Sequence, residues 1–255
     1  MNSKPAVLIC TRFKYIGFPK TFTVMPDDFS EKEEASLKKY INEAMESVPE
    51  LCSTHLQSRI MLVNKRHVIL GVVAYLRDLS EDGWEGKDKG TRLIYGFFGY
   101  VWKRNGFVPF NDFPESSCFT KLLNTWIRPH WEDSPNGNWA EMPHISSYDA
   151  DVTIQQSTEA SSAYQPADYV GKTVVVSSDK EEQLVRWGMT QLTRSDDFSI
   201  CTNVYVVSRQ NYDGPFRYVS NMAKSTSANK SEVGQKRAKT APDVTQESDS
   251  QKETV

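Results

Sequence analysis

The chain has 255 residues, of which 38% are hydrophobic and 25% charged, and its formal net charge at pH 7 is −3. A chain of this length can bury one large core or two small ones, and the composition is ordinary for a globular protein. Residues 221–255 hold six basic and five acidic residues, so the negative charge belongs to residues 1–220. General electrostatic binding to nucleic acid or to an anionic membrane is therefore disfavoured.

Two features indicate an intracellular protein that does not bind membranes. The longest apolar run, HVILGVVAYL from His67, has ten residues, about half of what a membrane span needs. The early run PAVLIC is too short for a secretory signal. We expect a cytoplasmic location, with nuclear import as the alternative, because KRAK at 236–239 fits a short basic import signal.

No metal or cofactor is expected from the sequence motifs. The four cysteines form no C-x-x-C pair, so neither a zinc knuckle nor a redox pair is predicted, and they are interpreted as buried, reduced thiols. The tripeptide Gly171-Lys172-Thr173 resembles part of a phosphate-binding P-loop. However, Pro166 stands where the motif needs its first glycine, and a strand rather than a helix is predicted to follow.

The first elements in chain order are two strands and a helix. Residues 6–13 and 21–25 are rich in β-branched and aromatic residues and are predicted to be strands. Ser30 and Glu33 have the spacing of a capping box, and apolar residues then recur at helical spacing as far as Pro49.

A hairpin, a further strand and a second helix follow. Residues 59–63 and 67–76 are predicted to pair around the turn Asn64-Lys65-Arg66, and the next strand covers residues 92–103. A helix is then expected from Pro114, with Pro129 ending it. In both long strands the even and the odd positions are mostly apolar, so we expect helices on both faces of the sheet, or a partner protein on one face.

The periodic pattern disappears over residues 129–168, which are interpreted as an irregular insertion. It returns with a strand at 173–178, a helix from a second capping box at Ser178 and Glu181, and a strand at 199–208. Residues 221–255 contain no aromatic residue and are predicted to form a disordered polar tail.

These elements predict an α+β fold with a largely antiparallel sheet, helices on its faces and a C-terminal βαβ unit. The order ββαβββα of the first seven elements is that of longin and profilin-like folds, an analogy in element order and length only. We expect a single domain over residues 1–220. The alternative is a division into 1–128 and 169–220 around the insertion.

Residues 90–106, GTRLIYGFFGYVWKRNG, could be a base-stacking strand or a core strand. The RNA-recognition motif places aromatic residues at fixed positions around a glycine. Aligning that glycine to Gly96 puts Gly99 in an aromatic position, and aligning it to Gly99 misplaces Val101 and Trp102. We therefore predict a core strand, in which the glycines let a bulky neighbour approach.

The leading prediction for function is a non-enzymatic protein-interaction or adaptor module. Tryptophans in polar loops are costly unless they pack inward or meet a partner, and three lie in predicted loops, Trp84, Trp131 and Trp139. Another protein is therefore the expected partner.

Two alternatives remain open. A metal-assisted hydrolase or nuclease could use the loop 130–151, where histidines and carboxylates lie close in sequence, namely His130, Glu132, Asp133 and His144. A nucleic-acid-binding protein could use the basic residues that flank the aromatic strand, namely Lys87, Lys89, Arg92, Lys103 and Arg104.

Overall fold

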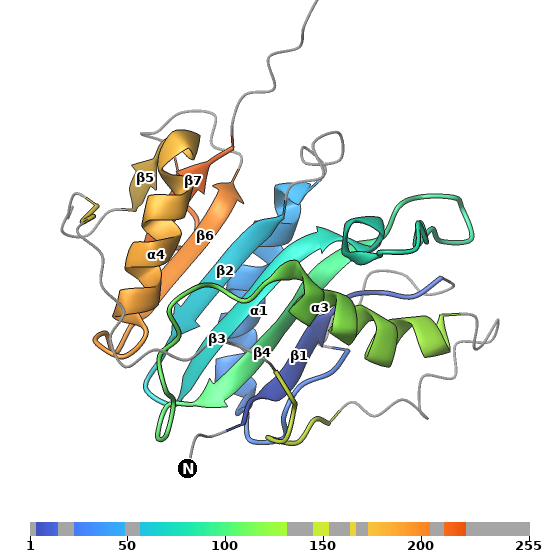
Figure 1. Ribbon diagram of the computed structural model, residues 1–255, viewed down its shortest axis with the longest axis horizontal. Helices are drawn as coiled ribbons and strands as arrows, with labels where there is room; N and C mark the ends of the chain where they lie inside the picture. Colours follow the sequence, from blue (N-terminus) through green and yellow to red (C-terminus); the bar gives the residue numbers. More distant parts are fainter. Residues whose placement is uncertain are drawn as a thin grey trace, which may run out of the picture. The chain divides into compact units, whose positions relative to one another are not determined.

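The computed structural model describes residues 4–14, 23–48, 57–131, 145–152, 164–166, 173–204 and 212–222. They belong to one compact unit, Met1–Lys224. Its centre is a mixed sheet in the order β1-β4-β3-β2-β6-β7-β5 (Figure 1). The predicted α+β class is confirmed. No helix in the described ranges is long and apolar enough to cross a membrane.

The strands are β1 Ala6–Cys10, β2 Ser58–Val63, β3 His67–Tyr75, β4 Tyr95–Lys103, β5 Val174–Val176, β6 Phe198–Val204 and β7 Tyr218–Asn221. The α-helices are α1 Glu31–Glu46, α3 Ser116–Leu122 and α4 Glu181–Gln191. Short helical turns are η1 Leu76–Leu79, η2 Leu123–Ile127, η3 Arg128–His130 and η5 Ser178–Lys180. Neighbouring strands are antiparallel from β1 to β6, whereas β7 runs parallel to both β6 and β5.

Helix α1 begins at the predicted capping box. The Ser30 hydroxyl accepts a hydrogen bond from the Glu33 amide, and the Glu33 carboxylate accepts one from the Ser30 amide at 3.0 Å. Two donors that the first helical turn leaves open are thereby satisfied. The buried side of the helix, which includes Leu37 and Ile41, then packs on the sheet.

Both faces of the sheet are covered by helices, as the apolar strands predicted. In β3, Val68, Leu70, Val72 and Ala74 belong to the core that α3 and α4 cover, whereas Ile69, Val73 and Tyr75 belong to the core under α1. Figure 1 shows α3 and α4 in front of the sheet and α1 behind it. The helices therefore explain why both faces of these strands are apolar, and a partner protein is not needed to explain it.

Strand β4 is an interior strand, paired with β1 on one side and β3 on the other. Gly99 stands directly opposite Gly71 of β3, and the ring of Phe97 lies against both. A Cβ atom built on either glycine would be 2.5 Å from that ring. The aromatic segment is thus a core strand in which glycine makes room for a neighbouring ring.

Two local predictions are wrong. Residues 21–25 do not form a strand within the described part, 23–25: Val24 and Met25 make only isolated bridges, with Ile9 and Ile145. The proline at position 26 ends any ladder there, since it has no N–H to donate. The second capping box is also absent, because residues Ser178–Lys180 form a 3₁₀ turn and α4 starts at Glu181 without a side-chain cap.

The predicted βαβ unit is present as β5-α4-β6, but an unpredicted strand lies within it. Strand β7 pairs parallel with β5 on one side and with β6 on the other. Residue 221, the expected start of the tail, is the last residue of β7. Residues 205–208 of the predicted last strand, most of the insertion and the tail from residue 223 lie outside the described residues.

Candidate functional site

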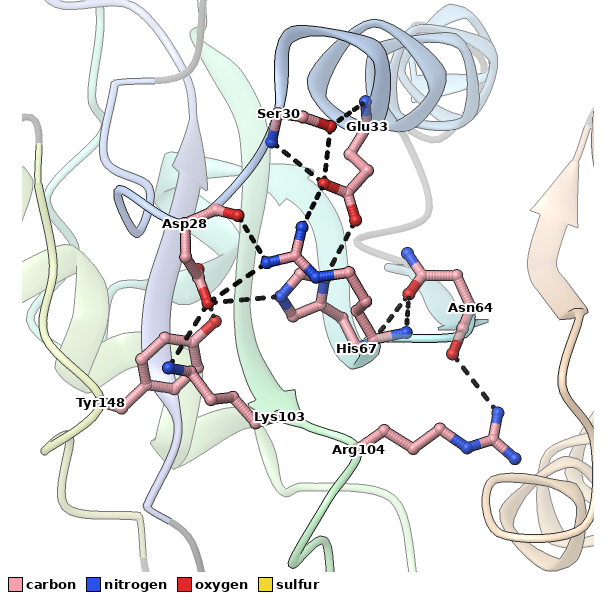
Figure 2. Close-up of polar contacts among 9 residues, drawn as sticks. Asp28, Ser30, Glu33, Asn64, His67, Lys103, Arg104 and Tyr148 are labelled. Carbon is pink, nitrogen blue, oxygen red and sulfur yellow. Dashed lines mark hydrogen bonds and ion pairs between the residues drawn. The ribbon is translucent and has the colours of Figure 1, made fainter.

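The turn between β2 and β3 carries a cluster of polar side chains (Figure 2). The Asn64 side-chain oxygen accepts hydrogen bonds from the amides of Arg66 at 2.8 Å and His67 at 2.7 Å. The Asn64 side chain thereby holds the backbone of the turn. The Arg104 amide, after the end of β4, donates to the Arg66 carbonyl at 2.8 Å and ties the turn to the neighbouring strand.

His67 lies at the centre of this cluster and is 1% exposed. Its ring stacks on Phe29, with the ring centroids 4.3 Å apart and the planes 8° from parallel. Its Nε2 is 3.8 Å from an Asp28 oxygen. Its Nδ1 is 3.9 Å from a Glu33 oxygen and has no hydrogen-bond partner among the residues that the structure describes. Burial lowers the pKa of His67 in spite of the two carboxylates, so the imidazole is neutral at pH 7.

The carboxylate of Asp28, beside His67, is stabilised by Tyr148 and Lys103. Tyr148 donates its hydroxyl proton to Asp28 at 2.9 Å, and the Lys103 ammonium is 3.5 Å from the same carboxylate and 4.4 Å from the centre of the Tyr148 ring. Burial alone would raise the pKa of Asp28, but the hydrogen bond from Tyr148 and the charge of Lys103 outweigh it, and the pKa is lowered. Asp28 is therefore charged at neutral pH.

Two open cavities flank the turn. One, of about 250 Å³, has a largely basic lining that includes Lys65, Arg66, Lys103 and Arg104. The other, of about 380 Å³, shares Lys65 and Arg66 with it. Its floor is apolar, with Phe29, Leu37, Tyr40, Leu62 and Ile69, and Lys32 stands on its rim. We call these two cavities and their basic rim, Lys32, Lys65, Arg66, Lys103 and Arg104, the turn surface.

The burial of neutral His67 predicts that the protein loses stability as the pH falls below 6.5. In that range the unfolded chain takes up a proton at this histidine before the folded protein does, because the folded pKa is the lower one. Urea unfolding between pH 8 and pH 5 should give a lower midpoint at acid pH. The variant His67→Gln should show a smaller decrease, and an equal decrease in both proteins would contradict the prediction.

The structure divides the basic residues predicted for nucleic-acid binding into two groups. Lys103 and Arg104 belong to the turn surface, whereas Lys87, Lys89 and Arg92 lie before the start of β4. The two ends of β4, Tyr95 and Lys103, are roughly 26 Å apart, since the strand has eight residue steps of about 3.3 Å. The two groups do not form one continuous patch.

Most of these cations also have acidic partners. Lys87 pairs with Glu85 at 2.7 Å, Arg92 with Asp88 at 2.9 Å, and Arg104 with Asp196 at 2.8 Å. An ion pair with a carboxylate weakens the attraction between a cation and the phosphates of a nucleic acid.

Two of the three loop tryptophans pack against each other. The rings of Trp84 and Trp131 meet edge to face with centroids 4.9 Å apart, and Trp131 is 5% exposed. Arg128 stacks over Trp84, with its guanidinium carbon 5.2 Å from the ring centre. This packing explains how Trp84 and Trp131 are accommodated in polar loops. Trp139 lies outside the described residues.

The predicted hydrolase loop is described only in part. His130 ends η3 and is half-buried, and Glu132, Asp133 and His144 lie outside the described residues. Within the described ranges, no three histidine, cysteine, aspartate or glutamate side chains gather as metal ligands.

The turn surface was only partly foreseen from the sequence. Lys103 and Arg104 were predicted as contact residues. The contributions of Phe29, Lys32 and Lys65 were missed, because these residues lie far from β4 in sequence. The tripeptide Asn64-Lys65-Arg66 carried the available signal, since it places two cations at a hairpin tip.

Fold and site together define an α+β protein with a helix-covered mixed sheet and a basic, apolar-floored surface at one hairpin turn. No family model, curated protein or solved structure matches the chain significantly.

Proposed function

We propose that the protein is a non-enzymatic interaction module, and that its turn surface binds an acidic segment of a partner protein that carries an apolar anchor residue. One observation carries the proposal: an apolar-floored cavity and a basic cavity adjoin and share Lys65 and Arg66. An apolar side chain could enter the first cavity while neighbouring carboxylates meet the second.

The charges around the turn support an acidic partner. Lys32 and Lys65 are exposed, and neither has an ion-pair partner among the residues that the structure describes. The two acids beside the turn are already paired, since Glu33 contacts Arg66 at 2.8 Å and Asp28 contacts Lys103 at 3.5 Å. Asp197, at the edge of the larger cavity, has no ion-pair partner among the residues that the structure describes. Because residues 1–220 carry a net negative charge, the basic turn surface would attract an acidic segment to this end of the sheet.

The floor of the larger cavity supports an apolar anchor. Phe29 and Tyr40 are only partly buried, and both line it together with Leu37 and Ile69. Interface anchors are most often aromatic or large aliphatic side chains that fill such a recess. The expected anchor is phenylalanine, leucine or tryptophan.

Selection from a random peptide library tests the proposal. Peptides enriched on the full chain should combine one large apolar residue with two or more acidic residues. The double variant Lys32→Glu/Lys65→Glu should bind them about tenfold more weakly, since each exposed charge contributes up to about 1 kcal/mol. Fluorescence anisotropy at two salt concentrations measures this loss.

The matched control is Lys39→Glu, another exposed lysine on α1 that lines neither cavity. It should bind the selected peptides as the wild type does. Selected peptides without acidic residues, or equal binding by the double variant, would refute the proposal.

A further inference from the structure

A third cavity, of about 320 Å³, lies at the other end of β2 from the turn surface, near residues 57–59. It opens on the side of the sheet that α3 and α4 cover, because its apolar residues Val72 and Phe119 belong to that core. Its polar residues include Gln57, Arg59, Glu181 and Asn203, and Phe113 completes the apolar wall. Its volume is at the small end of the range for ligand pockets.

A largely buried ion pair lies in the wall of this cavity. Arg59 of β2 contacts Glu181, the first residue of α4, with 3.1 Å between the guanidinium nitrogen and the carboxylate oxygen. Their side chains are 25% and 13% exposed. Burial raises the pKa of Glu181, against the lowering effect of the Arg59 charge. Buried ion pairs add little net stability, so stability alone gives no reason for this one.

An irregular strand places a third polar group beside the pair. Asn203 has a φ of 55°, in the left-handed region, within the irregular register of β6 between Cys201 and Val204. Its side-chain amide donates to the Gln57 carbonyl at 3.0 Å and to Glu181 at 3.4 Å. Strained backbone of this kind occurs preferentially at binding sites.

Donors and acceptors remain available on this wall. Arg59 makes its contacts with Glu181 and Glu182 through one terminal nitrogen, and its other N–H groups have no partner in the described part of the chain. Glu182 is 65% exposed on its side chain and can turn away from Arg59. The Asn203 side-chain oxygen accepts no hydrogen bond from the described residues, because both contacts of that side chain use its nitrogen.

We propose that this cavity binds a free α-amino acid with an apolar side chain. The ligand carboxylate accepts hydrogen bonds from Arg59, the favoured geometry for guanidinium and carboxylate. The ligand ammonium donates to the Asn203 oxygen and pairs with the charge of Glu181, whose carboxylate also accepts hydrogen bonds from Ser220, at 3.4 Å, and from Thr202. The ligand side chain lies against Phe113 and Phe119. Each end of the zwitterion thus meets a group of opposite charge, and the site is independent of the turn surface.

Isothermal titration of the full chain with L-phenylalanine and L-leucine tests the site. We expect saturable binding of at least one of them. The analogues 3-phenylpropionate, which lacks the ammonium, and 2-phenylethylamine, which lacks the carboxylate, should bind at least about tenfold more weakly than L-phenylalanine, because a charge-assisted hydrogen bond is lost. The variants Arg59→Gln and Glu181→Gln should show the same loss.

Two further variants keep the test informative if a charge variant misfolds. Phe113→Ala removes a half-buried ring and should weaken L-phenylalanine binding several-fold, whereas Lys65→Glu on the turn surface should leave it unchanged. No saturation by either amino acid up to about 10 mM would overturn the proposal. Equal affinity for the two analogues and for L-phenylalanine would overturn it as well.

Discussion

Replacement of Gly99 by valine is expected to lower the free energy of unfolding by about 3 kcal/mol, the upper part of the range for overpacked cores. A Cβ atom there would lie 2.5 Å from the Phe97 ring and 2.8 Å from the Leu70 carbonyl oxygen. The ring can turn only into a close-packed core, and the carbonyl belongs to the ladder between β3 and β4. Chemical denaturation followed by tryptophan fluorescence measures the loss.

The Phe97→Leu background supplies the control for this variant. A smaller side chain at position 97 removes the ring contact but leaves the carbonyl contact, so Gly99→Val should cost clearly less there. The difference between the two backgrounds is the coupling free energy of the two positions. An identical cost in both would show that the ring does not restrict position 99.

Replacement of Asp88 by alanine is the second change with a large expected effect, a loss of about 2 kcal/mol, because hydrogen bonds to a charged group are lost. The Asp88 side chain is 3% exposed and lies 2.9 Å from both Arg12 and Arg92. It also accepts the Arg92 amide proton at 2.9 Å. Removing it leaves Arg12, which is 12% exposed, without its partner.

The same carboxylate should make stability depend on acid pH. Although burial acts in the opposite direction, the hydrogen bonds from Arg92 and Arg12 lower the pKa of Asp88 to about 2 from 3.8. Its contribution is therefore complete above pH 3.8 and is lost as the pH falls toward about 2. Acid unfolding of Asp88→Ala should lack this component.

The control is Glu85→Ala, which breaks the exposed pair with Lys87 in the same loop. It should change stability by less than about 0.5 kcal/mol. A similar loss in both variants would mean that Asp88 acts as an ordinary surface residue.

The sequence predicted those parts of the fold in which local pattern and tertiary burial agree. The two-faced strands at 67–76 and 92–103 and the capping box of Ser30 and Glu33 are all present. The prediction for 21–25 failed because a β-rich composition does not ensure a continuous ladder. Strand β7 was missed because four residues give too short a pattern to separate a strand from a loop.

The candidate site was harder to predict than the fold. Phe29, Lys65 and Lys103 come from three segments that meet only because β4 pairs with β3 and α1 begins beside the turn. No pattern of residue spacing within one segment could predict that these three residues lie close together. Lys103 and Arg104 were predicted because they are charges at the end of an apolar strand. Arg59 and Glu181, which line the separate cavity, were not predicted, because each lies within an element whose pattern is ordinary.

The position of β7 also constrains the order of folding. Among the described strands, β5 pairs only with β7, which is the last of them and follows β5 by about 40 residues. During synthesis, β5 and α4 therefore leave the ribosome before β7, with which β5 pairs, has been synthesised. The antiparallel strands from β1 to β6 can pair earlier, so the parallel edge should form last and set the slowest folding phase.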